Sequence, residues 1–372
     1  MTSATITNVR VFDGGLLSAL TSVEINGESI SAVGAAPRGE IIDGGGGVLM
    51  PGLIDSHVHI DDAGQLQQLL AYGVTTALDM ANANPRVTDS LRNLPGLPQL
   101  FGAGLAASAP GGVHTKKMGY PQHSAVQSPS DAERFVADRV RDGSDYIKII
   151  VEDPKMPGTA SLPPATLAAL VDAAHGVALI VIAHAVTSAA VDLATDAGAD
   201  VITHAPVNRS LTAQEAGILA ARDAAIVPTL TMLQGTTRVI NARRVFRMLR
   251  RLRIAPPVEY ANARARVAVA RAAGVAIVVG TDANNDKAAP WNPDYGSSLH
   301  DELELLVDAG LTPAEALTAA TATAARVFGL SDRGAVHAGF RADLLLLDGD
   351  PTADIRATRS IKGVWIDGRK LI

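Results

Sequence analysis

Six side chains that can bind a metal ion or move a proton stand in five separate segments of the chain. They are four histidines, one lysine and one aspartate, namely His57, His59, Lys148, His184, His204 and Asp282. The chain contains no cysteine, which excludes thiolate ligands, disulfides and a cysteine nucleophile. Any metal ion must therefore be bound by imidazole, carboxylate or a less usual group.

The positions of these residues favour a shared site over isolated structural roles. His57 and His59 lie two residues apart in LIDSHVHI, and in a β-strand this spacing directs both side chains to one face. Lys148 lies among isoleucines in YIKIIVE, where a charged group is costly to bury unless it is paired or modified. A single strand-end histidine is more commonly structural, and a strand lysine more commonly lies at an edge or on the surface. The number of histidines and the apolar flanks of Lys148 indicate a metal site instead.

Eight short apolar segments alternate with Ala-rich segments of helical period. The predicted strands begin at Leu53, Val74, Gln99, Tyr146, Ala178, Val201, Ala225 and Ala276. The predicted helices cover residues 65–72, 130–142, 163–174, 188–196, 212–222 and 259–273. This alternation is typical of parallel βαβ units, and eight units close most simply into a (β/α)8 or TIM barrel of the α/β class. His184, His204 and Asp282 would then lie at the strand ends that form the barrel mouth.

Both ends of the chain predict a second, smaller unit. Residues 1–50 contain the strand segments ATITNVRVF and SVEINGESISAVG, and residues 335–372 contain RADLLLLDG and IKGVWIDGRKLI. The pairs Asn26-Gly27 and Asp367-Gly368 predict hairpin turns. Neither end is long enough to build a core alone. We therefore expect residues 1–50 and 335–372 to form one composite β-sandwich and residues 51–334 to form the barrel.

The composition limits the possible partners. Of the 372 residues, 47% are hydrophobic and 19% charged, which predicts a folded protein with a sizeable core. A net charge of -6 disfavours nucleic acid, and 3% aromatic residues leave few stacking surfaces. No targeting segment is visible, and no apolar segment approaches the roughly 20 residues of a membrane span. We expect a cytoplasmic homo-oligomer with a small-molecule substrate and neither a nucleic-acid nor a membrane partner.

The order of the motifs resembles the amidohydrolase superfamily, and within it the imidazolonepropionase-like and prolidase-like group. The matching motifs are MPGLIDSHVH from Met50, the isolated lysine of YIKII, the histidines of IAHA and ITHA, and VVGTDA from Val278. The stretch LHDELELLVDAGLTPAEALTAATATAARVFGL, followed by GFRADLLLLDGDP, is also similar to this group. The resemblance covers nearly the whole chain.

The resemblance implies a binuclear metal-dependent amidohydrolase. The implied ligands are His57, His59 and Asp282 for one divalent ion and His184 and His204 for the other. Lys148 would bridge both ions as a carboxylated lysine formed with CO2, and Zn2+ accepts such ligands. A metal-bridging hydroxide would cleave an amide C–N bond, and Asp282 would move its proton to the leaving nitrogen. The implied substrates are N-acyl amino acids or Xaa-Pro-type dipeptides.

A carboxylate on such a substrate needs a cationic or multiply donating partner. The candidates are His114, Tyr120, Arg209 and Arg238. His114 lies in APGGVHT, where the group often has Gly-Gly-His and this chain has an additional valine. Arg238 begins an Arg-rich segment, residues 238–253, in which apolar residues recur at helical spacing. This segment has three interpretations: a solvated lid, a subunit contact, or an anion clamp over the site.

Three functions remain open at this point. The first is a binuclear hydrolase that cleaves an amide C–N bond. The second is a lactonase, or a cyclic-amide hydrolase or deaminase on the same scaffold; mononuclear members of the group typically lack the lysine, so Lys148 disfavours them. The third is a non-catalytic protein with the amidohydrolase fold. Such proteins usually lose metal ligands, and none of the six is missing here.

Overall fold

The eight predicted strands are present and form two parallel sheets. The computed structural model describes residues 3–82, 84–112, 115–116, 119–155, 159–243, 258–287 and 289–372. One sheet contains β6 (Leu53–Val58), β7 (Val74–Asp79) and β8 (Gln99–Gly102). The other contains β9 (Ile147–Ile150), β10 (Val181–His184), β11 (Val201–Thr203), β12 (Ala225–Val227) and β13 (Ala276–Ile277). Two single parallel bridges, Ala107 to Ile149 and Val58 to Ala283, connect the sheets.

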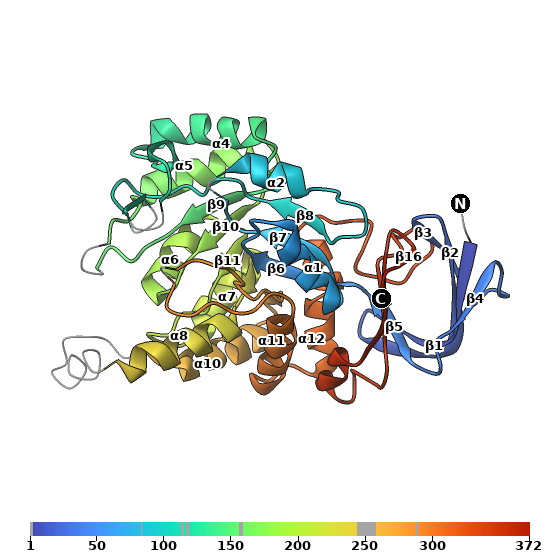
Figure 1. Ribbon diagram of the computed structural model, residues 1–372. Coiled ribbons are helices and arrows are strands. Elements are labelled where there is room, and N and C mark those ends of the chain that lie inside the picture. The colour runs from blue at the N-terminus through green and yellow to red at the C-terminus, as the bar shows by residue number, and fades with distance from the viewer. Residues whose placement is uncertain are drawn as a thin grey trace.

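Helices follow these strands and cover the parallel sheets (Figure 1). Every residue of β6, β7 and β9 is buried, polar residues included, as is typical of parallel strands that are covered on both faces. Among the described residues, no helix has the length and apolar character needed to cross a membrane. The α-helices are α1 (Ala63–Ala71), α2 (Pro85–Leu91), α4 (Ala132–Arg141), α5 (Pro164–His175), α6 (Ser188–Ala197), α7 (Ala213–Ala221), α8 (Leu230–Ala242), α10 (Tyr260–Ala272), α11 (Ser297–Asp308), α12 (Pro313–Ala319) and α13 (Ala322–Val327).

The seventh strand is shorter than the sequence predicts. The apolar run from Ala225 predicts a strand up to Met232, whereas β12 ends at Val227 and α8 begins at Leu230. Pro228 has no backbone N–H and cannot continue the ladder. The turn passes through Thr229, which has a φ of 49° and a ψ of 49°. The segment after β12 is therefore a tight turn into a helix, and Thr229 is buried within it.

Strands from both ends of the chain form one mixed sheet of eight strands (Figure 1). They are β1 (Ser3–Asp13), β2 (Leu16–Asn26), β3 (Ser29–Val33), β4 (Glu40–Asp43), β5 (Val48–Pro51), β14 (Leu344–Leu347), β15 (Ile361–Ile366) and β16 (Arg369–Lys370). The two ends meet where β5 pairs antiparallel with β14. The predicted turns after Asn26 and Ile366 are present, with Asp367 at a φ of 51°. The domain boundaries at residues 50 and 335 stay a prediction.

Candidate metal centre

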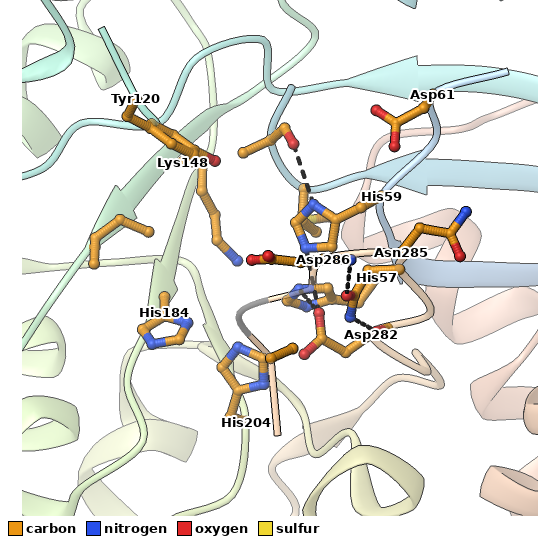
Figure 2. Close-up of a pocket in the computed structure, with 15 residues that line it drawn as sticks. His57, His59, Asp61, Tyr120, Lys148, His184, His204, Asp282, Asn285 and Asp286 are labelled. Carbon is orange, nitrogen blue, oxygen red and sulfur yellow. Dashed lines mark hydrogen bonds and ion pairs between the residues drawn. The ribbon is translucent and has the colours of Figure 1, made fainter. Parts of the chain in front are cut away.

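All six predicted ligand residues line one cavity of about 270 Å³. Figure 2 shows their side chains directed toward a common space. His57 lies in β6 and Lys148 in β9, His184 ends β10, His204 follows β11, and Asp282 lies in the loop after β13. The cavity is lined by His57, His59, Asp61, Met80, Ala81, Tyr120, Lys148, Ile150, His184, His204, Asp282, Asn284, Asn285, Asp286 and Ala289. The strand-end placement therefore brings together residues that are more than two hundred positions apart in sequence.

Two imidazoles converge on a single carboxylate oxygen. The Nε2 atoms of His57 and His59 lie 3.3 Å and 3.2 Å from Oδ1 of Asp282. One ligand atom from each of these three residues lies within 4.8 Å of the others. The strand β6 ends at Val58, so His59 reaches Asp282 from the loop and not from the strand that the sequence predicts. Asp282 itself has a φ of 61°, which is uncommon for a residue other than glycine.

The hydrogen bond of the second ring nitrogen of His59 indicates the tautomer of this ring. Nδ1 of His59 lies 3.1 Å from the carbonyl oxygen of Ala81. A carbonyl oxygen only accepts, so Nδ1 carries the proton and Nε2 of the neutral ring carries the lone pair. That lone pair faces the carboxylate oxygen of Asp282, an arrangement that is stable only with a cation or a proton between the two atoms. The donor set therefore fits a divalent metal ion.

The second half of the cavity contains His184, His204 and Lys148. The ring centroids of His184 and His204 are 4.6 Å apart, and those of His57 and His204 are 4.9 Å apart. Nδ1 of His204 bonds to the hydroxyl of Thr229, so Nε2 is the ring nitrogen left for the cavity. Nζ of Lys148 donates to Oγ1 of Thr203 at 3.0 Å. His184 and His204 offer two ring nitrogens for a second ion, whereas Lys148 as an ammonium has no free electron pair and cannot serve as a ligand.

The electrostatics favour neutral nitrogen ligands. Burial lowers the pKa of Lys148 to about 7, and burial together with the charge of Lys148 lowers the pKa of His57 to about 3. Burial also places the pKa of His204 well below its usual range. Burial opposes the ionisation of Asp282, yet the surrounding imidazoles hold its pKa well below the usual range. Burial opposes a charge on His59, but the hydrogen bond to Asp282 and the charge of that carboxylate raise the pKa of His59. At neutral pH the site therefore combines neutral rings at His57 and His204 with an ionised Asp282, the protonation states that bind metal.

Two buried carboxylates that the sequence analysis missed hold the ligand-bearing loops. Asp55 accepts hydrogen bonds from the N–H of His57 at 3.2 Å and from the hydroxyl of Thr281 at 2.8 Å, which joins both sides of the first metal position. Asp79 accepts from the N–H groups of Ile60 and Ala81 at 2.7 Å and 3.1 Å. Burial raises the pKa of Asp55 to about 7 and that of Asp79 to about 6. An acidic residue inside an apolar strand segment was the available signal for both.

Of the four predicted substrate-binding residues, one lines the cavity, two do not, and one lies outside the described residues. Tyr120 lines the cavity (Figure 2). Arg209 does not line the cavity and instead forms a two-pronged ion pair with Glu215, at 2.8 Å and 2.5 Å. Arg238 is an exposed residue of α8, also away from the lining. His114 and residues 244–253 of the Arg-rich segment lie outside the described residues.

Acidic and amide side chains also line the cavity, and all of them except the buried Asn284 are exposed or half-exposed, as expected for residues at its opening. They are Asp61, Asn284, Asn285 and Asp286. Among the described lining residues, Lys148 is the one cationic type, and it lies deep in the site with 3% of its surface exposed. The described part of the cavity therefore presents negative charge to an incoming substrate.

Parallel strands with helices on their faces, and a histidine–carboxylate cluster near the strand ends, are typical of a metal-dependent enzyme with an α/β fold. Residues 48–371 match the Amidohydrolase family, and the chain belongs to this family. An uncharacterized protein of Mycobacterium tuberculosis is 29% identical over 325 residues, which cover 82% of this chain and 80% of that protein. Adenine deaminase of Nitratidesulfovibrio vulgaris is 28% identical over 324 residues, which cover 82% of this chain and 48% of that enzyme. Imidazolonepropionase of Deinococcus radiodurans is 37% identical over 101 residues, 26% of this chain and 24% of that enzyme.

Solved structures show the same fold. A Xaa-Pro dipeptidase with methionine bound in its active site has a TM-score of 0.84 and 22% identity, with 100% of both chains covered. A prolidase structure from Bifidobacterium longum, itself assigned provisionally, has a TM-score of 0.83 and 25% identity, with 100% of this chain and 94% of that chain covered. The protein therefore has a TIM-barrel-like α/β fold, and the family assignment makes it a hydrolase.

Proposed function

We propose that the protein is a binuclear metal-dependent amidohydrolase that cleaves an amide C–N bond. The observation that carries this proposal is the convergence of His57 and His59 on one oxygen of Asp282. The carbonyl oxygen of Ala81 accepts a hydrogen bond from the other ring nitrogen of His59. His57, His59 and Asp282 would hold one ion, and His184 and His204 the other. We propose Zn2+, because it accepts imidazole and carboxylate ligands in a site without cysteine.

Lys148 is proposed to bridge the ions as a carbamate. Its nitrogen bonds to the carbon of CO2 and loses one proton, and the resulting anion offers two oxygen atoms. The reaction needs a neutral amine, and burial lowers the pKa of Lys148 to about 7. Oγ1 of Thr203 accepts a hydrogen bond from Nζ and so holds the amine beside the end of β11. A structural lysine buried among isoleucines would be costly without such a conversion.

The reaction itself divides between the ions and Asp282. When bound, the ions would lower the pKa of a water molecule and polarise the scissile carbonyl group. Asp282 would take a proton from the attacking water and deliver it to the leaving nitrogen, so that the amine departs neutral. The low pKa of this carboxyl keeps it ionised at neutral pH, the state in which it has an oxygen that can accept a proton. His57 and His204, as neutral rings, would hold their positions without competing for it.

The charge near the cavity opening favours Xaa-Pro-type dipeptides over N-acyl amino acids. Both substrates carry a carboxylate, and a dipeptide also carries an ammonium group. Asp61 and Asp286 line the cavity and can pair with that ammonium group, which an N-acyl amino acid lacks. Arg209, the proposed carboxylate partner, is paired with Glu215 and does not line the cavity. Of the predicted carboxylate partners in the described part of the chain, Tyr120 is the one that lines the cavity, and His114 stays a candidate outside the described residues.

A cyclic amide or lactone is the second candidate substrate class. The imidazolonepropionase and adenine deaminase relatives favour a ring substrate. The buried Lys148 disfavours a mononuclear site, but a binuclear site can hydrolyse a ring as well as a linear amide. The cavity of about 270 Å³ has room for a small ring.

The two parallel sheets are proposed to close into a (β/α)8 barrel through the bridges at Val58 and Ala107. The mixed terminal sheet would then form the accessory β-sandwich beside it. Closure places the ends of the first and last strands next to each other, which is what the pairing of His57 with Asp282 requires.

The test of the proposed function is hydrolysis by the zinc-loaded protein. The substrates are Ala-Pro, N-acetyl-Pro and a small cyclic amide, and free amine or carboxylate release is measured. We expect Ala-Pro to have the highest kcat/KM and chelator-treated protein to lose the activity. Equal activity on all three substrates would contradict the dipeptide assignment, and no hydrolysis of any amide would contradict the proposed function.

A further inference from the structure

Thr229 occupies the N-cap position of α8 but does not cap this helix. A threonine at this position usually accepts a hydrogen bond from the second or third N–H of its helix. No side-chain capping bond is formed by Thr229, and its backbone is in the left-handed region with a φ of 49°. Its hydroxyl oxygen instead lies 2.9 Å from Nδ1 of His204, and both residues are buried. The residue gives up its ordinary capping role and contacts a candidate metal ligand.

Glu302 takes over the capping role from a distant part of the chain. This residue lies on α11 and is fully buried. Its carboxylate accepts from the N–H groups of Leu230 and Thr231 at 2.8 Å and 2.7 Å, and from the hydroxyl of Thr231 at 2.9 Å. Burial raises the pKa of Glu302 to about 7, and above that pH its negative charge is favourable because it faces the positive end of the helix dipole. With these N–H groups satisfied, the Thr229 hydroxyl is available to His204.

We propose that Glu302 and Thr229 form a positioning pair that sets the tautomer and the direction of the His204 ring. Glu302 fixes the first turn of α8, and this turn fixes Thr229 in its left-handed conformation. Oγ1 of Thr229 then accepts a hydrogen bond from the N–H of Nδ1. Nε2 then carries the lone pair and faces the cavity. This inference rests on the proposed function in one respect, the assignment of His204 as a metal ligand.

His59 provides a comparison for the tautomer that we propose for His204. Nδ1 of His59 bonds to a carbonyl oxygen, which fixes its tautomer directly. A hydroxyl oxygen can either accept or donate, so the contact with Thr229 alone does not fix that of His204. The backbone of His204 is itself in the left-handed region, with a φ of 72°, and its N–H donates to the carbonyl oxygen of Val227 at 2.9 Å. His204 and Thr229 lie in two different turns and both have this rare backbone conformation. This indicates that the two turns are shaped for the contact between their side chains.

The test uses three variants and two readouts. Thr229→Val removes the hydroxyl at nearly constant shape, Thr229→Ser restores it, and Glu302→Gln weakens the hold on α8. The first readout is the ¹⁵N chemical shift of the His204 ring nitrogens in metal-free protein at pH 8. The second is the zinc affinity of each protein, measured by competition with a chromogenic chelator. Thr237→Val is the matched control, because Thr237 is a buried threonine of α8 whose hydroxyl bonds only to the carbonyl of Gln234.

We expect a protonated Nδ1 in the wild type and a mixture of tautomers in Thr229→Val. Zinc affinity should fall about 10- to 100-fold in Thr229→Val, recover in Thr229→Ser, and stay unchanged in Thr237→Val. Glu302→Gln should change both readouts in the same direction as Thr229→Val. A protonated Nε2 in the wild type, or unchanged tautomer and affinity in Thr229→Val, would overturn the inference. A wild type that binds no zinc but keeps the Nδ1 proton would refute the proposed function and leave the positioning of the ring intact.

Discussion

Nζ of Lys148 on β9 donates to Oγ1 of Thr203 on β11, 3.0 Å away across the intervening strand β10. Thr203 in turn donates to the carbonyl oxygen of Ala183 at 3.2 Å, so its hydroxyl is held as an acceptor for the amine. His184 is the last residue of β10 and His204 directly follows β11, so both histidines lie at the ends of the two strands beside the amine. A carbamate on Lys148, as proposed above, would therefore form close to both histidines.

Replacing Lys148 tests that bridge. Lys148→Ala should lose hydrolysis and most of one metal ion, because the bridging anion cannot form. A short carboxylic acid at high concentration should partly restore both, since it can occupy the vacated space with two oxygen atoms. Metal content is measured by elemental analysis and activity by amine release. Full metal content and an unchanged rate in Lys148→Ala would refute the bridge.

Carbamate formation should depend on pH through the amine. With a pKa of about 7, the neutral fraction of Lys148 rises from about one tenth at pH 6 to about nine tenths at pH 8. Metal-free, decarboxylated protein should therefore regain activity faster as the pH rises through 7, at fixed dissolved CO2 and zinc. The initial rate of reactivation is measured at both pH values and should differ by about tenfold. A rate that is flat or falls with pH would contradict attack by this amine.

Asp282 is expected to be the proton carrier. Asp282→Asn keeps a similar shape and removes the proton acceptor, and such steps contribute about 10²- to 10⁴-fold to the rate. We expect a loss of kcat in this range with KM changed much less. Because Asp282 is also a proposed ligand, the kinetics are compared at equal zinc content. A loss of kcat below about tenfold would assign the proton transfer to another group.

The acidic cavity opening predicts a preference for a free amino group. Asp286→Asn should lower kcat/KM for Ala-Pro about tenfold, the effect of losing roughly 1.5 kcal/mol from a charge-assisted hydrogen bond. The same change should leave kcat/KM for N-acetyl-Pro nearly unchanged, which serves as the internal control. Arg209→Ala should affect neither substrate, because Arg209 is paired with Glu215 outside the cavity lining. Equal losses for both substrates in Asp286→Asn would contradict recognition of the ammonium group.

The strand order and the ligands were predictable because both depend on local patterns. Apolar runs at regular spacing predicted all eight parallel strands, and the position of His184, His204 and Asp282 at strand ends predicted their convergence. The predicted end of β12 was wrong, because the apolar run continues past Pro228 whereas the strand ends before it. Contacts between distant segments were not predictable, since nothing near Glu302 indicates that it binds the first turn of α8, 72 residues earlier.

The contacts of Arg209, a surface residue, were not predictable from the sequence either. The sequence places it just after the sixth strand, where a guanidinium could face the site. The sequence TAQE that follows predicts a capping box, and Glu215 does accept from both the N–H and the hydroxyl of Thr212. The same carboxylate also binds Arg209 and holds it at the helix start. The capping motif was visible in the sequence, but the competition for Arg209 was not.

The central claim, a pair of metal ions held by this set of ligands, is tested most directly by counting ions. The purified protein is loaded with zinc and bicarbonate, freed of excess metal, and analysed for zinc per chain. The account predicts about two ions per chain in the wild type and about one in Lys148→Ala. One ion per chain in the wild type would indicate a mononuclear enzyme, and none would indicate a binding protein; either result would contradict the account.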